Sequence, residues 1–475
     1  MAGSGTNKMK SSTFTEKIVL LGFWCFIGLI SLQFMYTKTE GIINNVLKLF
    51  SNTTLTVNVK DYGAKGDGFT EDTAAFQKAM DKVSLKGGGE VFIPAGNYIL
   101  QPIFVKSNVN LVGENRDTVT LKLSDDANDQ KQTRLVNINN VKNIKLKNIT
   151  FDGNYKKHTN GIEHMHAVFV WDSDHVTITH NRMKNAVGDG ISVTGSTRAS
   201  NYVTISNNII EDNHRSNIVV EQVNHIKIFN NISTSKVGRP TLHFEPWVEQ
   251  NLYDAKIYNN TFETNASETY SIQIEGTKGA GNFFNDLDFY NNTVTGSKGK
   301  FMIKETKGAK IHDNKLNVKK VYIWFKNENL QIYDNKIKSD VGFVMEGHLG
   351  NSKRTFIFDN TVTTKNDGIN VITGSDDTTY KRNTFVGSGG GRAAYLWANE
   401  TNIKNTKIIG NSFLNYGKGV ITESYRGHIV DGLNIEKNTF KNIGGFLVYA
   451  TKESSKHVTV QDNNLINTGR IDVQK

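Results

Sequence analysis

A pattern of six residues recurs along this chain: an apolar residue, two spacers, an asparagine, one spacer and a second apolar residue, as in IYNNTF at 257–262. Successive copies are separated by 21 to 32 residues. The asparagines of the pattern are Asn181, Asn208, Asn231, Asn260, Asn292, Asn314, Asn335, Asn360, Asn383, Asn411, Asn438 and Asn463. Self-similarity at this period is typical of a solenoid, in which each repeat buries its apolar face against its neighbours.

Alternating apolar residues precede each asparagine, for example Val203 and Ile205 before Asn208. A period of two indicates a β-strand, and no stretch there sustains helical spacing. A second short strand follows each asparagine, as at 191–193, 218–220 and 242–244. Coils of this length without a crossover helix predict a parallel β-helix.

The repeated asparagine has a structural interpretation. Asparagine tolerates the left-handed backbone of a tight corner and bonds to its own backbone. Stacked copies can also bond along the axis as a ladder. Several copies spell Asn-x-Thr or Asn-x-Ser, but the ladder already accounts for them, so glycosylation receives little weight.

Residues 18–36 contain no charged residue and are long enough to cross a bilayer. Lys8, Lys10 and Lys17 precede them, which places the amino terminus in the cytoplasm. No cleavage site with small residues follows, so an uncleaved signal anchor is favoured over a removed signal peptide. We therefore expect a single-pass protein of the cell membrane with an extracytoplasmic β-helix, divided into a cytoplasmic tail (1–17), a transmembrane anchor (18–36), a juxtamembrane linker (37–54) and a β-helix domain (55–475).

The composition of the chain limits the disulfides, polymers and metals that it can be expected to form or bind. Cys25 is the single cysteine, so no intrachain disulfide can form. The net charge of +10 suits an anionic polymer such as a uronic-acid polysaccharide or teichoic acid. No recognition helix or aromatic RNA-binding phrase occurs, so nucleic acid is not expected. No metal motif or cofactor motif is evident, calcium held by paired carboxylates stays open, and the sequence does not define an oligomeric state.

Two amino-terminal segments do not follow the residue pattern of the repeats. They are residues 59–83, with the turn GAKGDG, and residues 87–100, GGGEVFIPAGNYIL. Phe76, Met80 and Val83 give the first segment one apolar stripe, which predicts a short helix that caps the first coil. These segments resemble the amino-terminal signature of the pectate-lyase-like superfamily, which is shared by right-handed β-helix glycan enzymes and phage tail-spike proteins. The resemblance extends through the repeats to about residue 470 and implies a right-handed β-helix.

Candidate chemistry concentrates in the coils between residues 164 and 247. When their second strands are aligned, strand alternation sends His243 outward in one column and Glu221, Glu245 and Glu275 outward in the next. Neighbouring carboxyls raise one another's pKa, so a protonated and an ionised carboxyl can coexist near neutral pH. Such a pair supplies the acid and the base or nucleophile that cleavage of a glycosidic bond needs.

The segment Gly188-Asp189-Gly190 resembles the Gly-Asp-Asp segment of polygalacturonase-type glycosidases, but glycine replaces the second aspartate. That family's paired-aspartate mechanism therefore does not carry over intact. Arg215 lies in a run that resembles uncharacterised members of the superfamily, and it could act as a base, as a clamp on a sugar carboxylate or as scaffold. The expected catalytic residues are Asp189, Arg215, Glu221, His243 and Glu245, and the expected substrate-binding residues are His166, Trp171, His214, Trp247 and Glu275.

These observations predict a membrane-anchored enzyme that acts on an acidic cell-surface or extracellular glycan as a lyase, a hydrolase or an epimerase. A non-catalytic glycan-binding surface protein is the alternative. A phage tail-spike-like depolymerase ranks below both, because a virion protein has no use for the apolar residues 18–36.

Overall fold

The computed structural model describes residues 55–246, 252–265, 270–276 and 284–474. No helix in these ranges is long and apolar enough to span a membrane. The predicted tail, anchor and linker at 1–54 lie outside the described residues, as does Trp247. All elements below belong to one compact unit, Thr56–Lys475.

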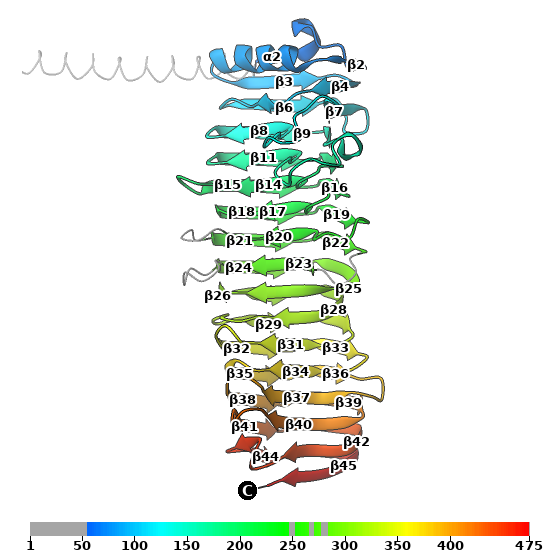
Figure 1. The fold of residues 1–475 in the computed structure, drawn as a ribbon, viewed down its shortest axis with the longest axis vertical. Coiled ribbons are helices and arrows are strands. Elements are labelled where there is room, and N and C mark those ends of the chain that lie inside the picture. The colour runs from blue at the N-terminus through cyan, green and yellow to red at the C-terminus, as the bar shows by residue number, and fades with distance from the viewer. Residues whose placement is uncertain (1–54, 247–251, 266–269, 277–283, 475) are drawn as a thin grey trace, which may run out of the picture. The chain divides into compact units, whose positions relative to one another are not determined.

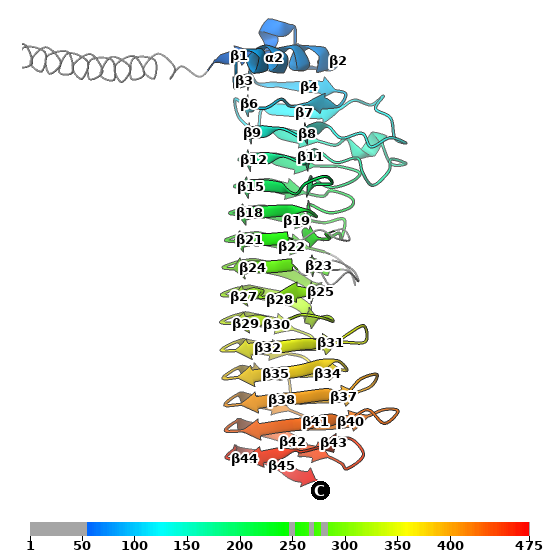
Figure 2. The same cartoon turned by 90° about the vertical axis from the view of Figure 1, so that its left-hand side faces the viewer.

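The unit is an all-β parallel solenoid of about 15 turns. Its strands stack one above another along a single long axis (Figures 1 and 2). Each full coil contributes up to three strands, which we assign to three faces. Face 1 is the 18-stranded sheet of β1 (Thr56–Asn58), β3 (Gly89–Ile93), β6 (Val109–Gly113), β9 (Lys142–Lys147), β12 (Asp174–Thr179), β15 (Ser200–Ser206), β18 (Val223–Phe229), β21 (Leu252–Tyr258), β24 (Phe284–Tyr290), β26 (Thr306–Lys307), β27 (Lys310–His312), β29 (Gln331–Tyr333), β32 (Ser352–Phe358), β35 (Ser375–Lys381), β38 (Ile403–Ile409), β41 (Val430–Glu436), β43 (Ser455–Lys456) and β44 (Thr459–Gln461).

Faces 2 and 3 together form the second, 27-stranded sheet. Face 2 follows the asparagine corner and consists of β2 (Asp67–Glu71), β4 (Gly96–Leu100), β7 (Val119–Leu123), β10 (Thr150–Asp152), β13 (Arg182–Lys184), β16 (Ile209–Glu211), β19 (Ile232–Ser235), β22 (Thr261–Thr264), β25 (Thr293–Lys304), β28 (Lys315–Ile323), β30 (Lys336–Ser339), β33 (Thr361–Thr364), β36 (Thr384–Val386), β39 (Ser412–Tyr416), β42 (Thr439–Ala450) and β45 (Asn464–Val473).

Face 3 carries the candidate site. It consists of β5 (Ile103–Phe104), β8 (Val136–Asn139), β11 (Val168–Trp171), β14 (Ile191–Thr194), β17 (Ile218–Val220), β20 (Leu242–Phe244), β23 (Tyr270–Glu275), β31 (Phe343–Glu346), β34 (Ile369–Ile372), β37 (Arg392–Ala398) and β40 (Lys418–Ser424). The long strands β25, β28, β42 and β45 run on from face 2 into face 3 and join the two.

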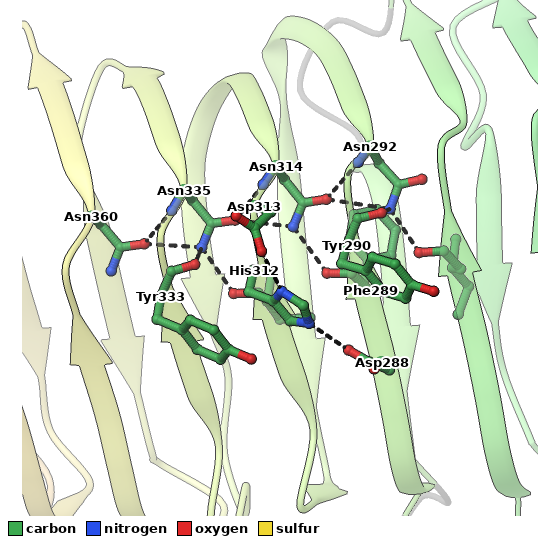
Figure 3. A network of polar contacts seen from close by, with 12 residues as sticks. Asp288, Phe289, Tyr290, Asn292, His312, Asp313, Asn314, Tyr333, Asn335 and Asn360 are labelled. Atoms are coloured by element: carbon green, nitrogen blue, oxygen red, sulfur yellow. Dashed lines mark hydrogen bonds and ion pairs between the residues drawn. The ribbon is translucent and has the colours of Figure 1, made fainter.

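The predicted asparagine ladder is present from Asn181 to Asn463. The backbone N–H of each asparagine donates to the side-chain oxygen of the next one along the axis, at 2.8–3.0 Å. Figure 3 shows four consecutive members, Asn292, Asn314, Asn335 and Asn360. Each of these four is no more than 1% exposed, so the ladder satisfies buried polar groups at every corner.

One part of the corner prediction is wrong. The left-handed backbone belongs to the residue before the ladder asparagine, as at Asn207, Asn259 and Asp334, where φ is 54° to 56°. The ladder asparagine is thereby free to turn its side chain into the coil. The two roles that the sequence predicted for the asparagine therefore belong to consecutive residues. The residue before it adopts the left-handed bend, and the ladder asparagine bonds to the neighbouring coils.

The predicted capping helix is α2 (Thr73–Leu85), at the amino-terminal end of the stack (Figure 1). Its predicted stripe of Phe76, Met80 and Val83 is fully buried, and the Phe76 ring meets Tyr98 edge-on with centroids 5.2 Å apart. Two short 3₁₀ turns, η1 (Val59–Tyr62) and η2 (Tyr155–Lys157), are the other helical elements of the described ranges. The helix therefore closes the first coil.

Candidate functional site

Face 3 presents its outward side chains in columns that run along the axis. Phe169 pairs with Ser192, Ser192 with Val219 and Val219 with His243, one coil apart at each step. This register is the one that the sequence predicted. Strand alternation then places the next outward residue of each coil in a second column, namely Trp171, Thr194, Glu221, Glu245 and Glu275.

A groove of about 380 Å³ opens over the first three coils of these columns. Its walls include the rings of His166, Phe169 and Trp171 and the carboxyl group of Glu221, and the Trp171 indole N–H donates to Ser196 Oγ at 3.0 Å. Loop residues before β8 and β11 form its outer wall, among them Gln132, Arg134 and His164. Aromatic walls with a few polar groups among them are typical of a site for a small molecule or a segment of a polymer.

Glu221 is the acid of this groove. Its Oε2 accepts a hydrogen bond of 2.6 Å from the hydroxyl of Thr194, one coil earlier. Burial raises the pKa of Glu221 to about 7, and the nearby carboxyls of Glu245 and Asp189 act in the same direction. A carboxyl group with this pKa is half protonated near neutral pH, which suits proton transfer.

Arg215 connects three carboxylates close to Glu221. Its guanidinium donates to Asp189 Oδ2 at 3.0 Å, to Glu163 Oε2 at 3.3 Å and to Glu245 Oε1. Burial acts to lower the pKa of Arg215, but these carboxylates outweigh it, so the pKa is raised. Of the roles left open by the sequence, this environment favours a permanent cation that orients carboxylates and opposes a base.

Asp189 and His166 lie beneath the arginine. The Asp189 side chain is completely buried, and its backbone N–H donates to His166 Nδ1 at 3.0 Å. Burial lowers the pKa of the His166 imidazole, so the ring is neutral at neutral pH. Both residues therefore support the arginine and the groove wall.

His243 adjoins Glu245, with Nε2 3.6 Å from Glu245 Oε2. Burial lowers the pKa of His243 to about 4, so at neutral pH this imidazole is uncharged. Glu275, one coil further, accepts hydrogen bonds from Gln273 at 2.6 Å and from Lys304 at 3.0 Å. Its carboxylate is thus held by a lysine, away from the Glu221 groove.

Of the remaining predicted substrate-binding residues, some line the groove and one does not. His166 and Trp171 line the groove, whereas His214 stacks on Tyr155 with its ring tilted by 11° and does not line it.

The departure from the Gly-Asp-Asp pattern at Gly190 has a steric cause. A Cβ atom there would lie 2.6 Å from Asn213 Nδ2 and 2.8 Å from the Asn217 carbonyl oxygen, so an aspartate does not fit.

The sequence interpretation missed Arg134. Its guanidinium carbon lies 3.6 Å from the centroid of the Phe169 ring, and the side chain is 8% exposed at the edge of the groove. Burial lowers its pKa to about 10, while Glu221 acts in the opposite direction, so Arg134 stays cationic at neutral pH. Arg134 belongs to a loop one coil before residues 164–247, in which the candidate residues concentrate. The repeat pattern does not extend to this loop, so it did not point to Arg134.

Within the part of the chain that the structure describes, no three His, Cys, Asp or Glu side chains gather so that they could hold a metal ion. The groove itself is lined by an acid, Glu221, and a cation, Arg134. Their arrangement supports proton transfer to a bound chain and recognition of a negatively charged group.

Two family models match the chain. The model described as rhamnogalacturonase A/epimerase, pectate lyase-like, matches residues 56–141. The model described as right handed beta helix region matches residues 134–316, which include the columns of face 3. The chain belongs to the pectate-lyase-like superfamily. The capped first coil and the stacked parallel strands agree with this membership.

Curated relatives match over a short segment. Mannuronan C5-epimerase AlgE2 of Azotobacter vinelandii is 40% identical over 108 residues, 20% of this chain and 11% of the relative. Alginate lyase 7 of the same organism is 38% identical over 108 residues, covering 20% and 12%. The preneck appendage protein of Bacillus phage PZA is 36% identical over 110 residues, covering 22% and 12%. The chain thus spans about an eighth of each relative's length or less.

Two solved structures superpose on most of this chain. The pre-mature bacteriophage phi29 gene product 12 superposes with a TM-score of 0.60 at 15% identity, covering 92% of this chain and 58% of that one. The A-module of mannuronan C-5 epimerase AlgE4 from Azotobacter vinelandii gives a TM-score of 0.50 at 19% identity, covering 85% and 99%. At these identities the likeness shows the fold alone.

Proposed function

We propose that the protein is an enzyme that cleaves glycosidic bonds in an acidic polysaccharide, with Glu221 as the proton donor. The observation that carries the proposal is the carboxyl of Glu221 in the groove of face 3, with its pKa raised to about 7 by burial. A second carboxyl, Glu245, lies one coil away in the same column and is held by Arg215. Such a pair is what cleavage of a glycosidic bond requires.

The two carboxyls have different partners, which separates their roles. Glu221 is bonded to the neutral hydroxyl of Thr194, whereas Glu245 is bonded to the guanidinium of Arg215. Burial raises the pKa of both groups and the charge of Arg215 opposes it in both, but only Glu245 also accepts a hydrogen bond from Arg215, which lowers its pKa further. A single proton shared between them therefore resides on Glu221, and the ionised partner is Glu245.

In hydrolysis, Glu221 gives its proton to the glycosidic oxygen while the bond from that oxygen to the anomeric carbon breaks. Glu245 either attacks the anomeric carbon, forming a glycosyl-enzyme bond that water then cleaves while Glu221 takes a proton from that water, or takes a proton from a water that attacks directly. Residues one coil apart are separated by about 4.8 Å along the stack, close to the spacing of about 5 to 5.5 Å in retaining glycosidases. The geometry therefore favours attack by Glu245 over activation of an intervening water.

Elimination is the second candidate reaction, and Arg134 is the observation that favours it. In this reaction the ionised Glu245 takes the proton from the carbon next to the sugar carboxylate, a carbon–carbon double bond forms as the bond to the glycosidic oxygen breaks, and Glu221 protonates the departing oxygen. Arg134 lies at the edge of the same groove, where its charge would stabilise the negative charge that develops on the sugar carboxylate. Relatives named as an alginate lyase and as mannuronan epimerases support this acidic substrate class.

We also propose that the enzyme acts outside the cytoplasm and stays attached to the membrane. The support is the uncharged stretch 18–36 behind Lys8, Lys10 and Lys17. The formal charge of +10 favours retention of a polyanionic glycan at the surface of the β-helix.

The test is an incubation of the full chain with alginate, polygalacturonate and a neutral glucan. Reducing ends report any cleavage, and absorbance of an unsaturated uronate reports elimination alone. We expect new reducing ends with an acidic polymer and none with Glu221→Gln. Binding of the acidic polymer without cleavage by the wild-type protein would instead establish a glycan-binding protein.

A further inference from the structure

Two lysines on face 3 lie outside the groove and have no ionic partner among the described residues. Lys300 of β25 and Lys320 of β28 are direct neighbours in the strand register. Neither ammonium forms an ion pair or a hydrogen bond with a described residue, whereas Lys304, further along β25, pairs with Glu275 at 3.0 Å. Two adjacent, partly buried cations without an anion are unfavourable, and a bound anion would compensate them.

Two tyrosine rings hold these cations in place. The Lys300 ammonium lies 5.2 Å from the centroid of Tyr270 and 5.6 Å from that of Tyr322. The Lys320 ammonium lies 4.4 Å from the centroid of Tyr322. We call these four residues, Tyr270, Lys300, Lys320 and Tyr322, the lysine–tyrosine patch. The rings attract the cations but leave their charge uncancelled.

The carboxylate of Glu346 lies beside the patch and is bonded by one of its members. The Tyr322 hydroxyl donates to Glu346 Oε2. Burial lowers the pKa of Lys320, and the charges of Lys300 and Lys319 add to that effect while Glu346 opposes it. Two lysines against the single carboxylate of Glu346 leave the patch with a net positive charge.

A hollow of about 450 Å³ is lined by Trp324, by Lys304 and Lys326 and by the acidic residues Glu275 and Glu305, and Trp324 joins it to the patch. Trp324 stacks on Tyr322 with centroids 5.7 Å apart, and its indole Nε1 is buried without a hydrogen-bond partner among the described residues. An aromatic wall, a donor without a partner and a pair of cations suit a ring that carries a carboxylate.

We propose that the lysine–tyrosine patch and the adjoining Trp324 form a second, distal binding site for a negatively charged sugar of the polysaccharide. Glu221 and Lys304 occupy the same column, three coils apart, so this site lies roughly 14 Å along the axis from the proton donor. A polymer laid along face 3 reaches both, whereas a short oligosaccharide in the groove does not. The inference rests on the proposed function and adds that long chains bind through two sites.

The patch favours a glycan over single-stranded nucleic acid. Tyr322 is 6% exposed, and two lysines and Trp324 surround its ring, so the Tyr322 ring offers no open face on which a base could stack. The charged groups instead match isolated anionic substituents along a chain.

The test measures binding to the full chain carrying Glu221→Gln, which prevents turnover. The probes are a galacturonate trimer, galacturonate oligomers of graded length, alginate and single-stranded DNA. With Lys300→Gln/Lys320→Gln, we expect the Kd of the long uronate chains to rise about tenfold or more and that of the trimer to stay unchanged. The matched control, Lys315→Gln/Lys336→Gln, removes the same charge from exposed positions of β28 and β30 and should leave all Kd values unchanged.

The outcomes separate the two proposals. If long uronate chains bind through Lys300 and Lys320 but the wild-type protein cleaves no acidic polymer, the distal site stands and the proposed function fails. The distal site is overturned if the Lys300→Gln/Lys320→Gln variant binds long chains as tightly as its parent, or if the control variant weakens binding equally. It is also overturned if none of the uronate polymers binds, or if DNA binds more tightly than the uronate chains through the same lysines.

Discussion

The hydroxyl of Thr194 donates to Glu221 Oε2 across one coil at 2.6 Å, and this bond counteracts the burial that raises the pKa of the carboxyl to about 7. If the protonated form of Glu221 is the proton donor, activity should fall as the pH rises through about 7. Thr194→Val removes the bond but keeps the shape, so the pKa of Glu221 should rise further. We expect the alkaline limb of the pH–kcat/KM profile to move to higher pH, and a limb that moves to lower pH would contradict the assignment.

Glu221 should also make stability depend on pH. Its pKa is raised from an ordinary 4.5 to about 7 in the folded protein, so the folded state holds a proton that the unfolded state releases. This contribution is fully present below about pH 4.5 and is lost as the pH rises through about 7. At pH 8, Glu221→Gln should therefore increase the free energy of unfolding by about 1 to 3 kcal/mol. At pH 4.5 the two proteins should unfold at nearly equal denaturant concentrations, which is the control.

Arg215 should matter more for folding than any one of its three acidic partners. Arg215→Gln leaves the fully buried Asp189 carboxylate without its cation, which should cost about 3 to 5 kcal/mol. Adding Asp189→Asn removes that charge, so the double variant should recover part of the loss. Chemical denaturation of the single and double variants measures both effects. Equal losses in the two variants would show that the ion pair is not the cause.

The residues that sequence reasoning placed correctly are those tied to the repeat. The asparagine and the period of two fix the strand register, and the register alone aligns Trp171, Glu221 and Glu245 on one column. The contacts that it missed involve loops of irregular length or a neighbouring coil. The Arg134 guanidinium over Phe169, the stacking of His214 on Tyr155 and the capture of Glu275 by Lys304 have no periodic signal.

The predicted topology can be tested on intact cells. If residues 18–36 are an uncleaved anchor with the tail inside, added protease should digest the β-helix and leave a short membrane-bound fragment that retains the amino terminus. Cells opened with detergent provide the control, because the tail should then be digested as well. A soluble protein in the medium that begins after residue 36 would refute attachment.

The ladder asparagines should support stability without affecting activity. Asn335 donates to the carbonyl oxygens of Ile311 and Tyr333 at 2.8 and 2.9 Å, and its side-chain oxygen accepts from the backbone and the side chain of Asn314 (Figure 3). Asn335→Ala leaves these buried groups without partners, at a cost of about 1 to 3 kcal/mol. The melting temperature should fall while the specific activity of the folded fraction is retained.

Lys338→Ala is the matched control for Asn335→Ala, because Lys338 is exposed in the same coil and has no role in the ladder. Its melting temperature should equal that of the wild-type protein. The ladder runs along the corner between faces 1 and 2, whereas the groove lies on face 3, so packing disturbed at Asn335 should not reach Glu221. Loss of activity in Asn335→Ala at an unchanged melting temperature would therefore place the functional surface at this corner and not on face 3.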